Sequence, residues 1–234
     1  MEVERSAFYY TGFRSDLVKL IRPETERLLS VGCGAGHTEA YLKQEMGLRE
    51  VVAVEINAEV VGALGELIDA VLIGDIQQLE LPYPSKHFDC ILYPDVLEHL
   101  VDPWVVLARH RRILSDEGII IASVPNVRYY YILLWLLFGD WPYSNRGILD
   151  MSHLRFFTLK SFTRMLAETG YSICTVHRKY RLVDALGDHL VLKIIKKALD
   201  RINKALSRIG FFDILIGLRE FFVFQYLVVA KKAE

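Results

Sequence analysis

The sequence has few cysteines, and their spacing matches no known cysteine-based site. Cys33, Cys90 and Cys174 are far apart, odd in number and form no C-x-x-C pair. This spacing argues against a zinc site and against an extracellular domain held together by disulfides. We therefore expect no metal site and a location in the reducing cytoplasm.

A leader sequence, long apolar runs and an excess of charge are also missing. Residues Met1–Arg5 lack the basic-then-apolar pattern of a signal peptide. Apolar runs such as Tyr129–Phe138 are shorter than the roughly 20 residues that a membrane-spanning helix needs. The formal net charge of -1 gives no general attraction to polyanions, so we expect no nucleic-acid partner.

The sequence does contain short apolar runs that alternate with helical patterns. Its 234 residues are 52% hydrophobic and 24% charged, which is enough for one packed domain. Strands are expected at Arg27–Val31, Val51–Val54, Ala70–Ile73, Phe88–Leu92, Ile119–Val124, Tyr171–Val176 and Phe221–Ala230, and helices at Thr38–Met46, Val60–Ile68, Pro103–Leu114 and Leu159–Glu168. Because the runs are apolar on both faces, they predict an α/β fold with a mostly parallel seven-stranded sheet covered by helices on both sides.

We expect a single domain over 1–234 that is divided into functional segments. An N-terminal helical cover over 1–26 precedes a core over 27–124. An insertion on the acceptor side follows over 125–158, and a basic helical insertion over 182–218 precedes the last strand.

A glycine-rich loop follows the first strand. Gly32, Gly34 and Gly36 would let the backbone turn tightly and let a ligand lie against it. Glu55 ends the next strand, where a carboxylate can accept both hydroxyls of a ribose. A dinucleotide fingerprint would need a glycine at the position of His37. The spacing therefore favours a nucleoside cofactor without phosphates, although a turn that holds no ligand remains open.

Five motifs in order carry a resemblance to a known family. They are Val31–Gly36, Val52–Glu55, Gly74–Ile76, Phe88–Leu100 and Ile113–Gly118. Over about 27–124 the chain resembles class I S-adenosylmethionine-dependent methyltransferases, which implies a Rossmann-like fold and S-adenosylmethionine as the cofactor. The resemblance implies that the cofactor contacts Gly32, Cys33, Gly34, Gly36, Glu55, Ile56, Asp75, Ile76 and Pro94. One departure is Ser30, which stands where many members have an acid that helps to hold the methionine end.

The segment before the first strand offers two further cofactor contacts. Related small-molecule methyltransferases cover the methionine end with an aromatic residue and an arginine. Tyr10 and Arg14 are the candidates here, and Arg14 could pair with a carboxylate through both arms of its guanidinium group. A surface arginine beside packed aromatic residues is the other interpretation.

Methyl transfer to a hydroxyl needs alignment and a base. Asp95 and His99 follow the fourth strand, at the carboxyl edge of the sheet where ligands bind. His153 lies in the acceptor-side segment, and a structural role is the other interpretation of either histidine. Arg128 and Arg155 are the candidates for binding the acceptor.

Two further segments resemble a particular group of methyltransferases and so imply a class of reaction. Ser123–Arg128 and Gly147–Thr158 are similar to segments of methyltransferases found with lipopolysaccharide and surface-glycan biosynthesis. This implies O-methylation of a sugar or a lipid-linked glycan. A methyltransferase for a lipid or quinone-like small molecule and a non-catalytic, membrane-associated scaffold remain as alternatives.

The stretch Leu182–Gly210 has apolar residues at helical spacing and a basic opposite face. That face carries Lys193, Lys196, Lys197, Arg201, Lys204 and Arg208. Such a helix can lie in an anionic membrane interface, and the mean hydropathy of +0.23 agrees with an enzyme at the inner face of the membrane. The other interpretation is a helix that covers the protein's own core or a homodimer interface.

Overall fold

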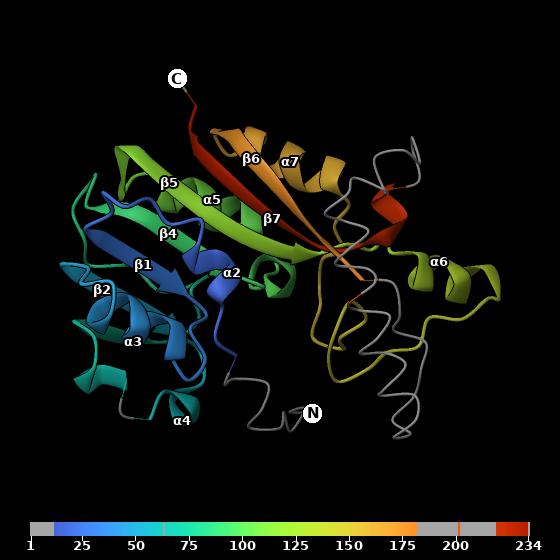
Figure 1. The fold of residues 1–234 in the computed structure, drawn as a ribbon, viewed down its shortest axis with the longest axis horizontal. Coiled ribbons are helices and arrows are strands. Elements are labelled where there is room, and N and C mark those ends of the chain that lie inside the picture. Colours follow the sequence, from blue (N-terminus) through green and yellow to red (C-terminus); the bar gives the residue numbers. More distant parts are fainter. Residues whose placement is uncertain (1–11, 63, 182–200, 202–218, 234) are drawn as a thin grey trace.

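The computed structural model describes residues 12–62, 64–181, 201 and 219–233 (Figure 1). The predicted contact Tyr10 and almost all of the basic stretch 182–218 lie outside the described residues. None of the described helices is both long enough and apolar enough to cross a bilayer.

A seven-stranded sheet forms the centre of the molecule, with the strand order β3-β2-β1-β4-β5-β7-β6. Its strands are β1 Arg27–Val31, β2 Glu50–Glu55, β3 Ala70–Ile73, β4 Phe88–Pro94, β5 Leu114–Pro125, β6 Tyr171–Tyr180 and β7 Val223–Lys232. The strands from β3 to β5 are parallel, whereas β7 runs antiparallel between β5 and β6. The prediction of a mostly parallel seven-stranded sheet is confirmed.

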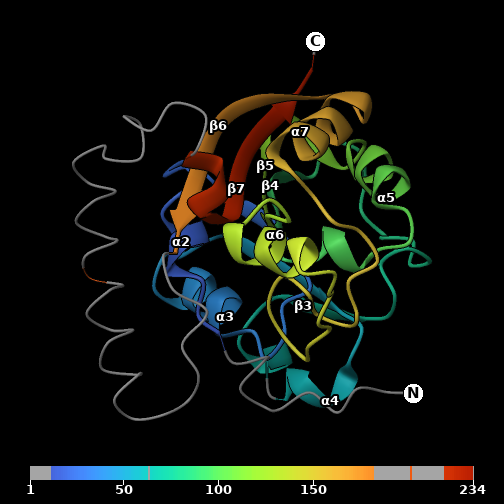
Figure 2. The ribbon, with the colours of Figure 1, turned by 90° about the vertical axis from the view of Figure 1, so that its right-hand side faces the viewer.

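The two faces of the sheet bury alternate residues of the same strands. In β1, Leu28 packs in the cluster that includes Leu42 of α3 (His37–Gln44), whereas Leu29 packs in the opposite cluster. That opposite cluster includes Leu107 of α5 (Pro103–His110) and Phe162 of α7 (Leu159–Glu168). This follows from the two-residue period of a strand. Figures 1 and 2 show α3 on one side of the sheet and α5 and α7 on the other.

Two helices have the starts that the sequence predicts, because their caps are encoded locally. The Asp102 side chain accepts a hydrogen bond from the Val105 N–H at the start of α5, and Thr158 forms a capping box with Ser161 at the start of α7. The predicted end of α5 is wrong. Leu114 pairs with Phe88 and begins β5, so the helix stops at His110.

The helix predicted over Val60–Ile68 is broken into two short pieces. These are α4 (Ala58–Val61) and the 3-10 turn η1 (Leu64–Glu66). Gly62 lies between them with φ 50° and ψ −127°, a conformation that is not helical and that favours glycine. The backbone at Gly62 therefore accounts for the difference.

The remaining described helices are short. They are α2 (Ser15–Val18), α6 (Tyr130–Leu137), and the 3-10 turns η2 (Leu97–His99) and η3 (Arg219–Phe222). Figure 1 shows α6 projecting away from the sheet.

The sheet order reverses direction between β1 and β4, since β1 continues to β2 on one side and β4 to β5 on the other. Loops that leave such a switch point diverge and open a crevice at the carboxyl ends of the strands. The glycine loop leaves β1, and the segment with Asp95, Glu98 and His99 leaves β4. The topology therefore brings the two predicted parts of the site to one edge.

Candidate active site

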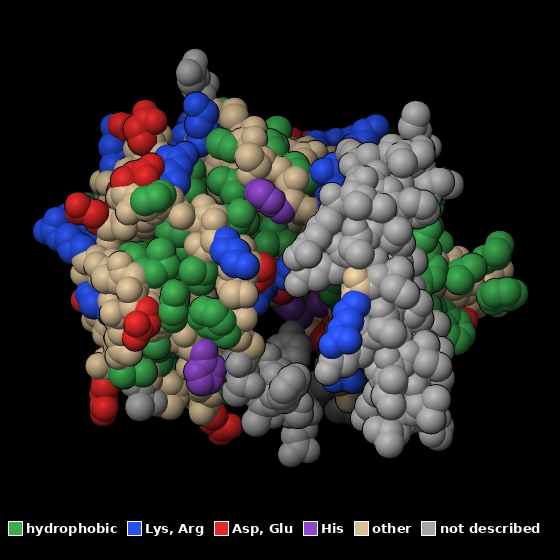
Figure 3. Space-filling view, in the orientation of Figure 1, with side chains coloured by type: hydrophobic (Ala, Val, Ile, Leu, Met, Phe, Trp, Pro, Cys, Tyr) green, Lys and Arg blue, Asp and Glu red, His purple; other side chains and the backbone are tan. Residues whose placement is uncertain are grey.

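A cavity of about 540 Å³ opens at this edge of the sheet, within the range of small-molecule sites. Of the predicted site residues, Arg14, Gly32, Cys33, Gly34, Glu55, Ile56, Asp75, Ile76, Pro94, Asp95, His99 and His153 line it. Figure 3 shows a hollow in the middle of the visible face, with histidine side chains in its depth. The structure thus brings most of the predicted residues to one space.

The glycine loop has the backbone that its sequence requires. Gly32, Gly34 and Gly36 have φ values of 77°, 57° and 74°, in the left-handed region that favours glycine. A Cβ at Gly36 would lie 2.1 Å from the Leu64 side chain. Gly36 is itself buried and lies outside the cavity lining. Its place in the structure is a close contact behind the loop, which differs from the ligand contact that we expected.

Glu55 connects the glycine loop to the end of β2. Its Oε2 accepts a hydrogen bond from the Gly34 N–H at 2.8 Å, and its Oε1 accepts from the N–H groups of Ile56 and Asn57 at 3.0 and 3.1 Å. A carboxylate offers about four acceptor positions, so these three bonds orient the group and leave acceptor capacity toward the cavity.

Cys33 contributes an apolar surface rather than a nucleophile. Burial raises the pKa of its thiol far above the usual value, and the carboxylates of Glu39 and Glu55 raise it further. A thiol that stays protonated is a weak nucleophile. Cys33 therefore serves as a small apolar part of the cavity wall.

Asp75 and Ile76, two of the expected cofactor contacts, lie in the loop after β3. The Oδ1 of Asp75 accepts a hydrogen bond from the Gln77 N–H at 2.9 Å, which shapes this loop. Ile76 is buried, whereas Ile56 is 68% exposed although both line the cavity. An exposed isoleucine beside a cavity offers an apolar surface that a flat ring could cover.

Ser30 does not leave this part of the cavity without an acid. Its hydroxyl donates a hydrogen bond of 2.6 Å to Oε1 of Glu39, and both side chains are buried. Among the described residues, Glu39 Oε2 has no hydrogen-bond partner, and Glu39 lines the cavity. Burial raises the pKa of Glu39 to about 7. Glu39 was not among the predicted site residues, although its place in the first helical turn after the glycine loop is a signal for it.

Arg14 is held by carboxylates of the protein itself. Its Nη1 donates to Asp95 Oδ2 at 2.7 Å, and its Nε and Nη2 donate to the two oxygens of Asp16 at 3.0 and 3.1 Å. The bidentate pairing that we expected with a ligand carboxylate is therefore made with Asp16. This ties the N-terminal segment to the loop after β4.

Asp95 is engaged by three donors of the protein itself, an arrangement that differs from the free catalytic base that we expected. Its Oδ1 accepts from the Ser123 hydroxyl at 2.8 Å and from Gln225 Nε2, and its Oδ2 accepts from Arg14. Asp95 also has a φ of 55°, which is uncommon outside glycine. These contacts make it the centre of a hydrogen-bond network beneath the cavity.

The two candidate histidines lie together, with ring centroids 4.7 Å apart. The Nδ1 of His153 lies 3.0 Å from the Ile148 carbonyl oxygen. The Nδ1 of His99 lies 3.2 Å from the Ser152 carbonyl oxygen and 3.0 Å from its hydroxyl. Because a carbonyl only accepts, each Nδ1 carries the proton, and Nε2 is the basic nitrogen of the neutral ring.

Glu98 is buried beside these histidines. Its side chain is 1% exposed, and burial together with Asp95 and Asp150 raises its pKa well above the usual value. Its backbone carbonyl accepts hydrogen bonds from the N–H groups of Leu154 and Arg155 at 2.8 and 2.9 Å. These bonds join the segment that carries His153 to the turn that carries His99.

The structure does not bring Arg128 and Arg155 to the cavity, which corrects their assignment to acceptor binding. The Arg128 guanidinium lies over the Phe221 ring at 5.0 Å. The Arg155 side chain donates to the Val101 carbonyl and lies 5.9 Å from the Trp104 ring centroid. Both guanidinium groups cover aromatic surface outside the cavity lining.

Comparison with known proteins decides the family. Residues 7–176 match the family model described as a methyltransferase domain. The chain belongs to this family. Membership indicates an enzyme with S-adenosylmethionine as its cofactor, in agreement with the sequence prediction.

Individual relatives are distant. The chain is 28% identical over 169 residues to a ubiquinone biosynthesis O-methyltransferase of Dinoroseobacter shibae. This alignment covers 62% of this chain and 59% of that protein. The chain thus spans about three fifths of that curated relative. A methyltransferase structure from Archaeoglobus fulgidus has a TM-score of 0.58 at 20% identity and covers 96% of both chains. One from Mesorhizobium loti has a TM-score of 0.61 at 14% identity and covers 93% of this chain and 96% of that one. These two structures support the fold.

The place of Glu55 predicts a large effect of its removal. We expect Glu55→Ala to weaken the binding of S-adenosylmethionine by about tenfold or more, because a charge-assisted pair to the ribose would be lost. Isothermal titration calorimetry measures the affinity. Glu59→Ala, at an exposed position of α4, is the matched control. An unchanged affinity in folded Glu55→Ala would contradict the assignment.

Glu39 predicts a more selective effect. We expect Glu39→Gln to weaken the binding of S-adenosylmethionine about tenfold, because the Glu39 carboxylate of the unmodified chain would pair with the cofactor's amino group. Binding of methylthioadenosine, which lacks the amino acid, should change by less than about twofold. Glu55→Ala should weaken the binding of both ligands. Equal losses for both ligands in Glu39→Gln would show that Glu39 only supports the loop.

Proposed function

We propose that this chain transfers a methyl group from S-adenosylmethionine to a hydroxyl of a saccharide or a lipid-linked saccharide. The observation that carries the proposal is the shared cavity. Glu55 and the glycine loop line it together with two histidines that present a basic Nε2.

The residues present suit the cofactor. Glycines at positive φ form the loop, Glu55 is oriented by backbone N–H groups, and the buried Glu39 Oε2 has no partner among the described residues. An unpaired buried carboxyl oxygen is unfavourable, and an ammonium group would satisfy it. When bound, S-adenosylmethionine supplies a methyl group on a positively charged sulfur.

The histidines suit a hydroxyl acceptor. A hydroxyl must lose its proton as its oxygen takes the methyl group, and a positioned base contributes roughly 10²–10⁴-fold to such a step. His153 is 9% exposed and His99 is partly buried, so a base here would work with little competing water. Either Nε2 could accept the proton.

The acceptor class rests on the similarity of Ser123–Arg128 and Gly147–Thr158 to glycan-associated methyltransferases. One observation favours a second candidate, a phenolic or quinone-like acceptor, because a curated relative is named a ubiquinone biosynthesis O-methyltransferase. In both candidates the acceptor atom is a hydroxyl oxygen, and both kinds of molecule can be attached to a lipid chain.

The exposed side of α6 supports an acceptor that is carried on a lipid. Leu136, Leu137 and Phe138 are 49%, 77% and 81% exposed, and Figure 3 shows apolar side chains at the edge of the molecule where Figure 1 places α6. A contiguous exposed apolar patch is a common mark of an interaction site. With the basic stretch 182–218 in the sequence, we propose peripheral binding to an anionic membrane.

The acceptor class can be tested with cofactor that carries a radiolabelled methyl group. We expect label in a lipid-linked saccharide fraction, and we expect it to resist mild alkali, because a methyl ether is stable where a methyl ester is cleaved. His153→Asn should lower the rate about 100-fold without changing cofactor affinity. His37→Asn, at an exposed histidine, is the control.

Other outcomes of this assay point elsewhere. Label in a catechol and none in the saccharide would favour the phenolic acceptor. Cofactor binding without transfer to either would favour the non-catalytic scaffold.

Membrane binding can be tested on α6. The double variant Leu137→Asp with Phe138→Asp should lower co-sedimentation with phosphatidylglycerol vesicles about tenfold, because two apolar side chains would no longer enter the interface. Met46→Asp, at an exposed apolar position after α3, is the control. Undiminished sedimentation of the double variant would refute the role of α6.

A further inference from the structure

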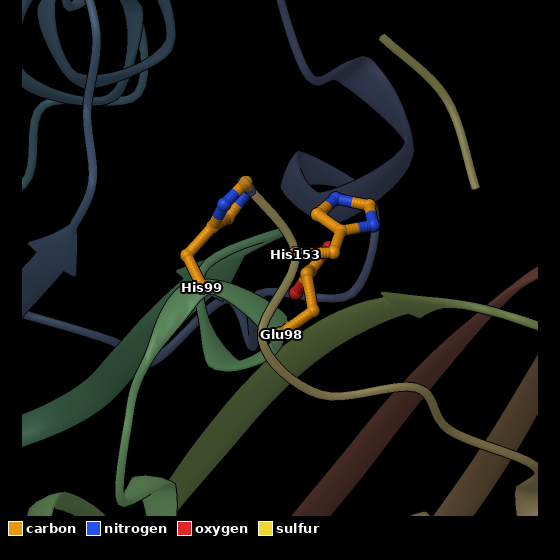
Figure 4. A group of neighbouring side chains, drawn as sticks. All are labelled: Glu98, His99 and His153. Carbon is orange, nitrogen blue, oxygen red and sulfur yellow. The ribbon is translucent and has the colours of Figure 1, made fainter. Parts of the chain in front are cut away.

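Three side chains at one end of the cavity can reach a common point. Glu98 and His99 belong to η2, and His153 comes from the segment between α6 and α7. A potential ligand atom of each lies within 4.8 Å of those of the other two. Figure 4 shows the carboxylate and the two imidazole rings converging from these two segments.

The Glu98 carboxyl group has no partner within the protein as described. Neither of its oxygens has a hydrogen bond to the described residues, although both are buried. Buried polar groups are almost always paired, and a buried carboxylate without a partner is very unfavourable. Glu98 lines the cavity, so a ligand in the cavity can supply that partner.

The charges nearby indicate which kind of ligand fits. Asp95 and Asp150 line the same cavity as Glu98. Arg14, the one lysine or arginine among the described lining residues, is already bound to Asp16 and Asp95. A cation would relieve this accumulation of carboxyl groups, whereas an anion would add to it.

The histidines are oriented as metal-binding histidines usually are. Each directs Nδ1 to a backbone carbonyl oxygen, His99 to Ser152 and His153 to Ile148. The Ser152 hydroxyl donates onward to Asp150 Oδ1 at 2.6 Å. Such outer contacts fix the ring and make Nε2 the ligand atom.

The backbone holds the two ligand-bearing segments together. The Glu98 carbonyl oxygen accepts from both the Leu154 and the Arg155 N–H groups. These bonds lie directly next to His153 and at Glu98 itself, so the ligands are placed close together by main-chain contacts. A preformed site needs little reorganisation when an ion binds.

We propose that Glu98, His99 and His153 bind a divalent transition-metal ion, with Zn²⁺ as the best match. Two imidazoles and one carboxylate form a common donor set for catalytic zinc, with a further position left for water or substrate. Mg²⁺ and Ca²⁺ prefer oxygen ligands, so the two imidazoles disfavour them.

This site differs from the expectation of no metal site, which was based on the cysteine spacing alone. The ligands come instead from an adjacent Glu-His pair and a distant histidine. Only the contact between η2 and the segment around His153 reveals the set.

The role of the ion rests on the proposed function. A hydroxyl bound to a divalent ion ionises more readily, so His99 and His153 would act as ligands instead of as bases. The acceptor oxygen gives its proton to water and forms a bond to the methyl carbon. The bond from that carbon to sulfur breaks, and its electron pair stays on sulfur.

Metal content tests the site without any activity measurement. We expect the full-length chain, stripped with a chelator and dialysed against Zn²⁺, to retain about one ion per chain by mass spectrometry. Glu98→Gln and His153→Asn should each lower retention at least about tenfold. Zn²⁺ should raise the melting temperature of the unmodified chain and not that of Glu98→Gln.

Two controls make the result specific. His37→Asn and Glu59→Gln change exposed residues of the same types and should retain the ion. Glu98→Gln should have the same circular-dichroism spectrum as the unmodified chain, which shows that it is folded. Equal retention in all variants, or no retention in the unmodified chain, overturns the site.

The rate of methyl transfer distinguishes a failure of the proposed metal role from a failure of the proposed function. If the zinc-free and zinc-loaded enzymes transfer the methyl group equally fast, the proposed role of the ion is wrong and the proposed function stands. If one Zn²⁺ binds at these residues and no hydroxyl acceptor is methylated, the site stands and the proposed function fails.

Discussion

The hydrogen bond from the Gly34 N–H to Glu55 joins the loop after β1 to the end of β2. Gly32 adds a backbone bond of 2.8 Å to the Val54 carbonyl oxygen at the end of β2. The loop after β1 is therefore held against the neighbouring strand before any ligand arrives. Because the carboxylate of Glu55 is fixed by three backbone N–H groups, its remaining acceptor positions have a defined direction. A preorganised acceptor of this kind needs little ordering on binding.

The cavity has a strongly acidic lining around one arginine. Glu39, Glu55, Asp75, Asp95, Glu98 and Asp150 all line it. Among the described lining residues, Arg14 alone is a lysine or an arginine, and it is bound to Asp16 and Asp95. A low-dielectric crevice lined by one sign of charge concentrates ligands of the other sign. A sulfonium, an ammonium group and a divalent cation all have the sign that this lining attracts.

Much of the fold could be predicted from local patterns. The bounds of β1 and β3 coincide with apolar runs, and Thr158 and Ser161 form a capping box at the start of α7. Errors arose where a distant partner decides the outcome, as at Leu114, which joins the sheet by pairing with Phe88. The glycine loop and Glu55 were predictable because consecutive strands of a parallel sheet bring their ends together.

The pairing of Glu39 with Ser30 and the proximity of Glu98 to His153 could not be predicted. In both cases the neighbour lies on another element, and only tertiary contact shows that one oxygen of Glu39 and both oxygens of Glu98 have no hydrogen bond to the described residues. Arg128 and Arg155 were misassigned because a sequence does not tell whether a guanidinium faces a cavity or covers an aromatic ring.

The position of β7 has a consequence for how the molecule assembles. Although β7 is the last strand in the chain, it lies between β5 and β6, and it brings Gln225 onto Asp95. A growing chain that has not yet made Val223–Lys232 leaves one side of β5 without a partner. Unpaired strand edges of this kind favour association between chains, and pairing over such long stretches of sequence slows folding. Closure of the sheet and completion of the network around Asp95 therefore both depend on this last strand.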